Sequence, residues 1–186
     1  MNSVVDNTEK REGLLIIISG PSGAGKGTVY NEVIKRRPEI QKSVSVTTRA
    51  PRPNEIEGVH YYFRTLEQYQ DMIAKGEFLE TVSVYCNYYG TPKDYVLRQM
   101  EQGKDVILEI EIDTLGAEQI RKKYPKSITI FIMPPTFKEL EKRLRGRGTE
   151  SEEAIQRRLG LARSELAKYR LFDYMVFNDE VESAVS

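Results

Sequence analysis

The chain has 186 residues, with 28 Lys or Arg against 28 Asp or Glu, so its formal net charge is zero. This balance gives no global field that favours nucleic acid or a membrane surface, and the length suits one domain with a substantial core. The single cysteine, Cys86, and the single histidine, His60, exclude internal disulfides and clusters of Cys or His around a metal. The early apolar run Leu14–Ile18 is too short for a signal sequence or a membrane span, so we expect a cytoplasmic protein.

The first half of the chain indicates one strand–turn–helix unit followed by a β-rich stretch. Residues 1–12 are polar and charged without periodicity, and we expect a disordered lead-in there. The run Leu14–Ile18 predicts a buried strand, and the helix after it is expected to end before Pro38. Within 39–91 the pattern predicts strands at 44–46, 78–79 and 82–84, a loop at 50–55 and a helix at 66–75.

From residue 92 onward, helical and strand patterns alternate. Strands separated by helices indicate a parallel sheet covered on both faces, which the β-rich residues 39–91 interrupt as an insertion. Thr149, with Glu152 three positions later, has capping-box spacing and is expected to begin the last long helix. The predicted helices are 92–102, 115–123, one carrying Phe137, Leu140 and Leu144, and one carrying Ile155, Leu159, Ala162 and Leu166; the predicted strands are 106–110, 127–133 and 174–177.

The turn after the first strand carries the strongest chemical signal. Its sequence, Gly20-Pro21-Ser22-Gly23-Ala24-Gly25-Lys26-Gly27-Thr28, fits a phosphate-binding loop up to the final position. Glycines let backbone N–H groups point at phosphate oxygens, while the helix N-terminus and Lys26 add positive charge. Because Thr28 comes one residue later than the pattern requires, we assign no direct magnesium ligand. The alternative is a glycine-rich turn that binds nothing.

Arginines gather in two predicted loops. Arg49 and Arg52 flank a stiff turn, and Arg143, Arg147 and Arg158 cluster around a glycine-broken loop predicted at 145–148. Guanidinium groups bind phosphate oxygens bidentately and stay charged, so these positions suit phosphoryl transfer. The alternative is that all five are solvated surface charges. In that case Arg143, Arg147 and Arg158 would form salt bridges with neighbouring glutamates.

Further motifs follow the glycine-rich loop in a fixed order. They are Ser45-Val-Thr-Thr-Arg49-x-Pro-Arg52, Gly58-x-x-Tyr61-x-Phe63, Glu77-Phe-Leu-Glu80, Asn87-Tyr-Tyr-Gly-Thr91, Arg143-Leu-x-Gly-Arg147-Gly-Thr-Glu-Ser-Glu and Asn178-Asp179. With the loop, this set resembles the guanylate kinase family from about Leu14 to the last residue. The resemblance implies an α/β fold, a parallel sheet flanked by helices. It also implies a P-loop NTPase core at 13–38, 92–144 and 159–186, a β-rich GMP-binding region at 39–91 and a helical lid at 145–158.

The resemblance implies an ATP:GMP phosphotransferase of purine nucleotide metabolism, acting on GMP and dGMP with MgATP. Guanine presents N1–H and N2–H₂ donors, which call for a carboxylate, and its O6 calls for a donor. Glu80 matches the base-recognising glutamate of the family. Tyr61 and Tyr89, taken without the family pattern, fit a core position equally well. The matching acceptor-site residues are Ser45, Arg49, Arg52, Tyr61, Glu80, Tyr89, Thr91, Glu109 and Glu111.

On the donor side, the resemblance assigns ATP's phosphates to the loop Gly20–Thr28 and the adenine contact to Asn178. The resemblance also implies that the lid arginines contact the phosphoryl group that is transferred. The residues expected to act in catalysis are Lys26, Arg49, Arg143, Arg147 and Arg158.

The chain departs from the family pattern at the end of the strand 106–110 and directly after it. Glutamates stand at Glu109 and Glu111 where the family usually has aspartates, and the spacing to Gly116 is two residues longer, which leaves Asp113 as a competing carboxylate.

Two other functions remain in view: a non-catalytic guanylate-kinase-like interaction module, and a kinase for another nucleoside monophosphate. The intact phosphate loop argues against the first, and Glu80 against the second.

Overall fold

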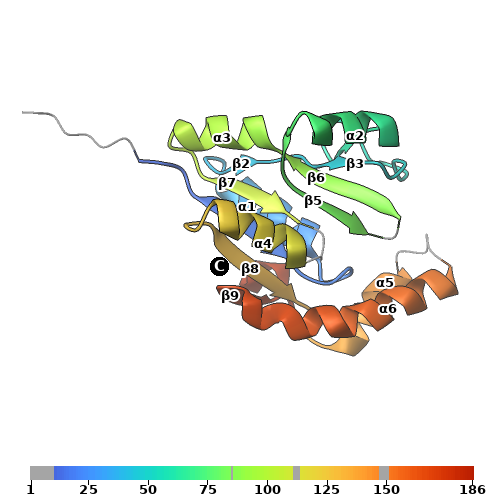
Figure 1. Cartoon of the computed structure of the whole chain (residues 1–186). Helices are drawn as coiled ribbons and strands as arrows, with labels where there is room; N and C mark the ends of the chain where they lie inside the picture. Colours follow the sequence, from blue (N-terminus) through green and yellow to red (C-terminus); the bar gives the residue numbers. More distant parts are fainter. Residues whose placement is uncertain (1–10, 85, 111–113, 147–150) are drawn as a thin grey trace, which may run out of the picture.

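The computed structural model describes residues 11–84, 86–110, 114–146 and 151–186. Its centre is a five-stranded parallel sheet in the order β2-β7-β1-β8-β9, which Figure 1 shows between layers of helices. The apolar sequence of β1 is buried almost throughout, as expected for a central strand with helices on both faces. The strands are β1 (Leu15–Ser19), β2 (Gln41–Lys42), β7 (Val106–Glu109), β8 (Ile128–Met133) and β9 (Tyr174–Phe177).

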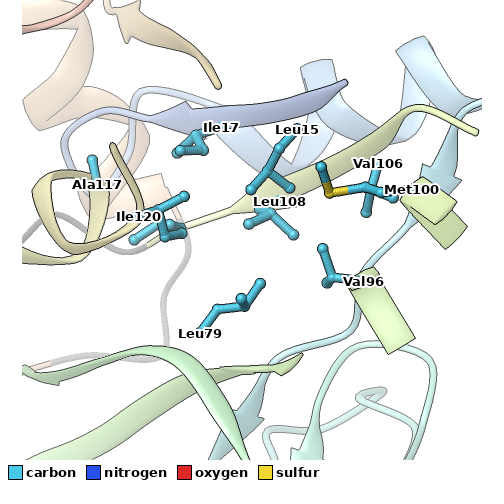
Figure 2. Packing of buried hydrophobic residues seen from close by; sticks show 10 residues of the cluster. Leu15, Ile17, Leu79, Val96, Met100, Val106, Leu108, Ala117 and Ile120 are labelled. Atoms are coloured by element: carbon cyan, nitrogen blue, oxygen red, sulfur yellow. The ribbon is translucent and has the colours of Figure 1, made fainter. Parts of the chain in front are cut away.

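Helices cover both faces of this sheet. On one face, α1 (Lys26–Arg36) packs beside α7 (Val181–Ala184) over a cluster that includes Val29 and Tyr30. On the other face, α3 (Lys93–Glu101) and α4 (Thr114–Lys123) bury apolar side chains against β1 and β7. Figure 2 shows this second cluster, in which Leu79 comes from outside the parallel sheet. The parallel sheet flanked by helices was the predicted fold, and it is confirmed.

A second, four-stranded sheet in the order β4-β3-β6-β5 forms most of the predicted insertion. It has its own small core around Val46, Tyr69 and Phe78, and its helix α2 begins with a capping box between Thr65 and Gln68. The predicted strand at 44–46 is shifted, and β2 belongs to the parallel sheet, so the insertion begins after β2. The elements are β3 (Val46–Thr47), β4 (Tyr62–Phe63), α2 (Leu66–Ala74), β5 (Phe78–Val84) and β6 (Asn87–Pro92).

A helix pair, α5 (Phe137–Gly146) and α6 (Glu152–Leu166), extends from the same end of the parallel sheet as the β5–β6 hairpin (Figure 1). The short η1 (Ala167–Leu171) follows α6. Two sequence predictions are corrected here. First, α5 continues to Gly146, where a loop was expected. Second, the N-cap of α6 is Ser151, whose Oγ accepts from the Ala154 N–H at 3.3 Å, and not Thr149, which lies outside the described residues.

The position of this cap has a physical reason. A Ser151 cap leaves two glutamates in the first turn of α6, where the helix dipole favours negative charge. Across the pair, three residues of the predicted apolar stripe of α6 pack on α5, while the fourth, Leu166, is half-buried outside this cluster. The buried residues are Leu140, Leu144, Ile155, Leu159 and Ala162. No helix within the described ranges has the length and apolar character that crossing a membrane requires.

Candidate active site

A polar cavity of about 320 Å³ lies where the glycine-rich loop leaves β1. The strands that follow β1 in sequence lie on both sides of it: β2 and β7 on one side, and β8 and β9 on the other. The order of the strands therefore reverses at β1, and ligands of open α/β sheets bind at such points. The cavity also takes residues from α6 and from the second sheet. Its lining consists of Ser22, Gly23, Gly25, Lys26, Gly27, Thr28, Asn31, Arg49, Arg52, Tyr61, Val84, Tyr89, Glu109 and Arg158.

The glycine-rich loop has the geometry that its sequence predicts. Gly23 and Gly25 have φ of 90° and 88°, a region that side chains disfavour, and Gly25 is the N-cap of α1. A Cβ at Gly25 would lie 2.3 Å from Asn178 Nδ2. Lys26 is buried, and its Nζ donates to the Gly20 carbonyl at 2.9 Å, which holds the ammonium group inside the loop.

Two predicted site residues are connected to the glycine-rich loop by hydrogen bonds. Asn178 is 3% exposed, and its Nδ2 donates to the Ala24 carbonyl at 2.8 Å. Arg143 donates from Nη2 to the Asn178 carbonyl at 3.1 Å and from Nε to Glu139 at 3.1 Å. The structure thus places both side chains beside the loop. Contact between Asn178 and adenine stays a prediction.

The lid arginines differ in where they lie. Arg158 lines the cavity, and its Nη1 donates to Ser22 Oγ at 2.6 Å, so α6 touches the loop directly. Arg147 lies outside the described residues. The alternative of pairing with neighbouring glutamates is met in part by Arg143, which pairs with Glu139 at 3.1 Å. Arg145, which was not among the predicted site residues, donates from Nη2 to Glu152 at 2.9 Å and ties α5 to α6.

On the opposite wall, Arg49 is held by a carboxylate that the sequence analysis missed. Arg49 Nη2 donates to Glu55 Oε1 at 2.8 Å, and these side chains are only 14% and 15% exposed. The Arg52 N–H donates to Glu55 Oε2 at 2.7 Å. Burial works to raise the pKa of Glu55, but hydrogen bonds from the two arginines outweigh it and hold that pKa below its usual range. The available signal was the spacing of Glu55, three residues after Arg52 in the same loop.

Aromatic rings complete this wall. The Arg49 guanidinium lies 5.5 Å from the centre of the Tyr61 ring, and the rings of Tyr61 and Tyr89 meet edge to face at 6.0 Å. Both tyrosines line the cavity, which favours the acceptor-site interpretation over that of core residues.

Glu80 is a buried carboxylate, 4% exposed. Thr91 Oγ1 donates to its Oε1 at 2.7 Å, and its Oε2 has no hydrogen-bond partner in the part of the chain that the structure describes. Burial raises the pKa of Glu80 to about 7, while hydrogen bonding from Thr91 works in the opposite direction. Glu80 is not among the residues that line the cavity, and a Cβ at Gly116 of α4 would lie 3.0 Å from this oxygen, so contact between Glu80 and a guanine base stays a prediction.

The remaining acidic and hydroxyl positions are only partly described. Glu109 lines the cavity, and its Oε2 lies 3.6 Å from where a Gly27 Cβ would stand. Ser45 directly precedes β3, and its carbonyl accepts from the Tyr62 N–H at 2.8 Å. Glu111 and its rival carboxylate Asp113 lie outside the described residues.

Comparison with known proteins places this geometry in a family. The sequence model of guanylate kinase matches residues 12–186. The chain is 48% identical to a guanylate kinase of Trichormus variabilis, over 99% of this chain and 92% of that protein. It is 50% identical to one of Carboxydothermus hydrogenoformans, over 94% of this chain and 85% of that protein.

Solved structures agree. The crystal structure of guanylate kinase from Anaplasma phagocytophilum matches with a TM-score of 0.76 and 32% identity, covering 95% of this chain and 82% of that one. The motifs, the P-loop architecture and these similarities agree, and the chain belongs to the guanylate kinase family.

Proposed function

We propose that this protein transfers the γ-phosphate of MgATP to GMP and to dGMP, giving ADP and the corresponding diphosphate. The observation that carries the proposal is the shared cavity. The phosphate loop with Lys26 forms one wall, and Arg49 and Arg52 form another. Two anion-binding walls around one cavity suit the transfer of a phosphoryl group between two nucleotides. We place the reaction in purine nucleotide metabolism in the cytoplasm, where both substrates occur.

The chemistry needs positioning and charge neutralisation, with no covalent intermediate on the protein. A phosphate oxygen of the acceptor attacks the γ-phosphorus, and the bond from that phosphorus to the bridging oxygen of ADP breaks. Lys26 and Arg158 neutralise donor charge, while Arg49 and Arg52 hold the acceptor phosphate. The α5–α6 pair excludes water, which would otherwise compete as the attacking group.

Magnesium fits the oxygen donors of the cavity. In the described part of the chain no group of three or more His, Cys, Asp or Glu could hold a metal. Thr28 and Glu109 offer hydroxyl and carboxylate oxygens on the lining, the ligand type that Mg²⁺ prefers, and we propose that they hold it through its water shell. When bound, the ion neutralises charge on the β- and γ-phosphates of ATP.

For the base, we propose that Glu80 in its ionised form accepts the N1–H and N2–H₂ groups of guanine, with Thr91 fixing the carboxylate. Adenine lacks this donor pair and would leave the carboxylate buried and unpaired. This proposal is supported by the unpartnered Oε2 of Glu80.

A coupled assay for ADP with GMP, dGMP, AMP and UMP tests the proposal. We expect turnover with the two guanine nucleotides only. Comparable kcat/KM values for AMP or UMP would mean another nucleotide specificity. GMP binding without turnover would favour the non-catalytic module.

The donor side has a matched pair of variants on α1. Lys26→Ala should reduce kcat by about 10³-fold or more, because its charge acts on the transferring group. Lys35→Ala removes an exposed lysine of the same helix, which pairs with Glu32 at 3.5 Å, and should leave kcat unchanged. Similar rates for the two variants would exclude the role assigned to Lys26.

A further inference from the structure

Glu80 lies at an irregularity in β5. Phe78 pairs with Pro92 and Thr81 pairs with Gly90, so between these pairs β5 has one residue more than β6. Such a bulge interrupts the ladder and redirects a side chain. The backbone around Glu80 therefore depends on contacts from outside the β5–β6 pair.

Helix α4 supplies those contacts on both sides of Glu80. Strand β5 is an edge of its sheet, and α4 packs against it. Gln119 Nε2 donates to the Thr81 carbonyl at 3.2 Å, and the Thr81 N–H donates to Gln119 Oε1 at 3.3 Å. Lys123 Nζ donates to the Leu79 carbonyl at 2.8 Å. One amide and one ammonium group thus fix the residues immediately before and after Glu80.

A third residue of α4 meets the carboxylate itself. A Cβ at Gly116 would lie 3.0 Å from Glu80 Oε2, so the glycine lets this oxygen stand close to the helix. Gly116, Gln119 and Lys123 are three and four positions apart, which puts them on one helix face. We call these three residues the α4 clamp. Leu79 joins the same interface through the core cluster, where Figure 2 shows it together with Ile120.

We propose that Gln119 and Lys123 are positioning residues for Glu80, and that the α4 clamp thereby sets the affinity for guanine and the rejection of purines without a 2-amino group. This rests on the proposed role of Glu80 in recognising the base. The α4 clamp connects a helix that packs on the parallel sheet to β5 of the second sheet, so recognition of the base depends on how the two sheets are joined.

A purely structural staple would behave differently. If the bonds from α4 only hold the insertion to the core, their loss lowers the melting temperature and changes the two substrates' KM values equally or not at all. A positioning role instead raises KM for GMP selectively, because only the base contact is displaced.

The test uses Gln119→Met and Lys123→Met in the full chain, with Glu118→Gln and Lys122→Met as controls on exposed neighbouring positions of α4. We expect KM for GMP to rise about tenfold in the two clamp variants, KM for ATP to stay within about twofold, and the controls to match the wild type. The preference for GMP over inosine monophosphate, which lacks the 2-amino group, should fall. Lys123→Arg keeps a donor and should restore most of the affinity.

The melting temperature of each variant is measured as well, because it distinguishes loss of the fold from loss of guanine recognition. Unchanged KM for GMP, or equal increases in both KM values, would overturn the clamp. Glu80→Gln serves as the reference: if it raises KM for GMP and the clamp variants do not, only the clamp is wrong.

If Glu80→Gln leaves KM for GMP unchanged, the proposed base recognition is wrong and the clamp fails with it. Combining Glu80→Gln with Gln119→Met should add nothing to the effect of Glu80→Gln alone, because both changes remove the same contact. Fully additive effects would contradict the proposal.

Discussion

The buried carboxylate of Glu80 makes a measurable prediction about stability and pH. Below its ordinary pKa of 4.5 the group is protonated in both the folded and the unfolded chain. As pH rises from 4.5 towards 7, the unfolded chain loses this proton while the folded chain retains it, and stability falls. Above about 7 the folded chain carries a buried charge. A rise in pKa from 4.5 to about 7 corresponds to a loss of about 3 kcal/mol of unfolding free energy by pH 8.

Glu80→Gln removes the titration and preserves the shape. The amide oxygen can still accept from Thr91, which donates to the carboxylate at 2.7 Å in the wild type. We therefore expect the variant to lack this loss, so that its stability relative to the wild type increases by about 3 kcal/mol between pH 4.5 and pH 8.

Urea unfolding at half-unit steps from pH 4.5 to 8 measures the difference directly. Subtracting the two curves removes the titration of all groups that the proteins share. A difference that stays flat across this range would refute the reasoning, because it would mean that Glu80 ionises as easily in the folded chain as in the unfolded one. The same variant should lose GMP affinity, so a more stable protein would be a poorer enzyme.

Four further predictions follow from particular residues. Gly25→Ala should raise KM for ATP at least tenfold, because φ is 88° and the new Cβ would lie 2.3 Å from Asn178 Nδ2; a wild-type KM would contradict the loop geometry. Glu55→Gln should raise KM for GMP several-fold by releasing Arg49, and equal changes for ATP would argue against that role. Cys86→Gly should stabilise the chain by about 0.5–1 kcal/mol in chemical denaturation, because Cys86 has φ of 63°, and a loss of stability would show that its side chain contributes more than its strain. Calorimetry near pH 6 should detect proton release when GMP binds, since Glu80 must ionise; no dependence of the heat on buffer would oppose this.

The sequence predicted those elements whose signal is local. The apolar runs that became β1 and β8 each have enough buried residues to indicate a strand on their own. By contrast, β2 consists of Gln41 and Lys42, which are polar and too few to show a period. They form a strand because the edge of β7 is available to pair with them.

The same division holds for the site. Motif residues such as Lys26 and Arg158 are brought to one cavity, as the family resemblance implied. Gln119 was missed because its partner Thr81 is 38 positions away and the contact involves backbone groups, which leave no trace in residue type. Arg147 and Glu111 stay predictions, since neither lies in the described residues.

The contact between Asn178 and the glycine-rich loop affects when the loop can form during translation. The Asn178 side chain holds the Ala24 carbonyl across 154 positions, and Arg143 joins it from α5. During translation, the glycine-rich segment leaves the ribosome long before either support exists. In a nascent chain, the nucleotide-binding loop therefore lacks these two hydrogen-bonding side chains until β9 and Asn178 have been synthesised. Incomplete chains would bind cellular ATP weakly.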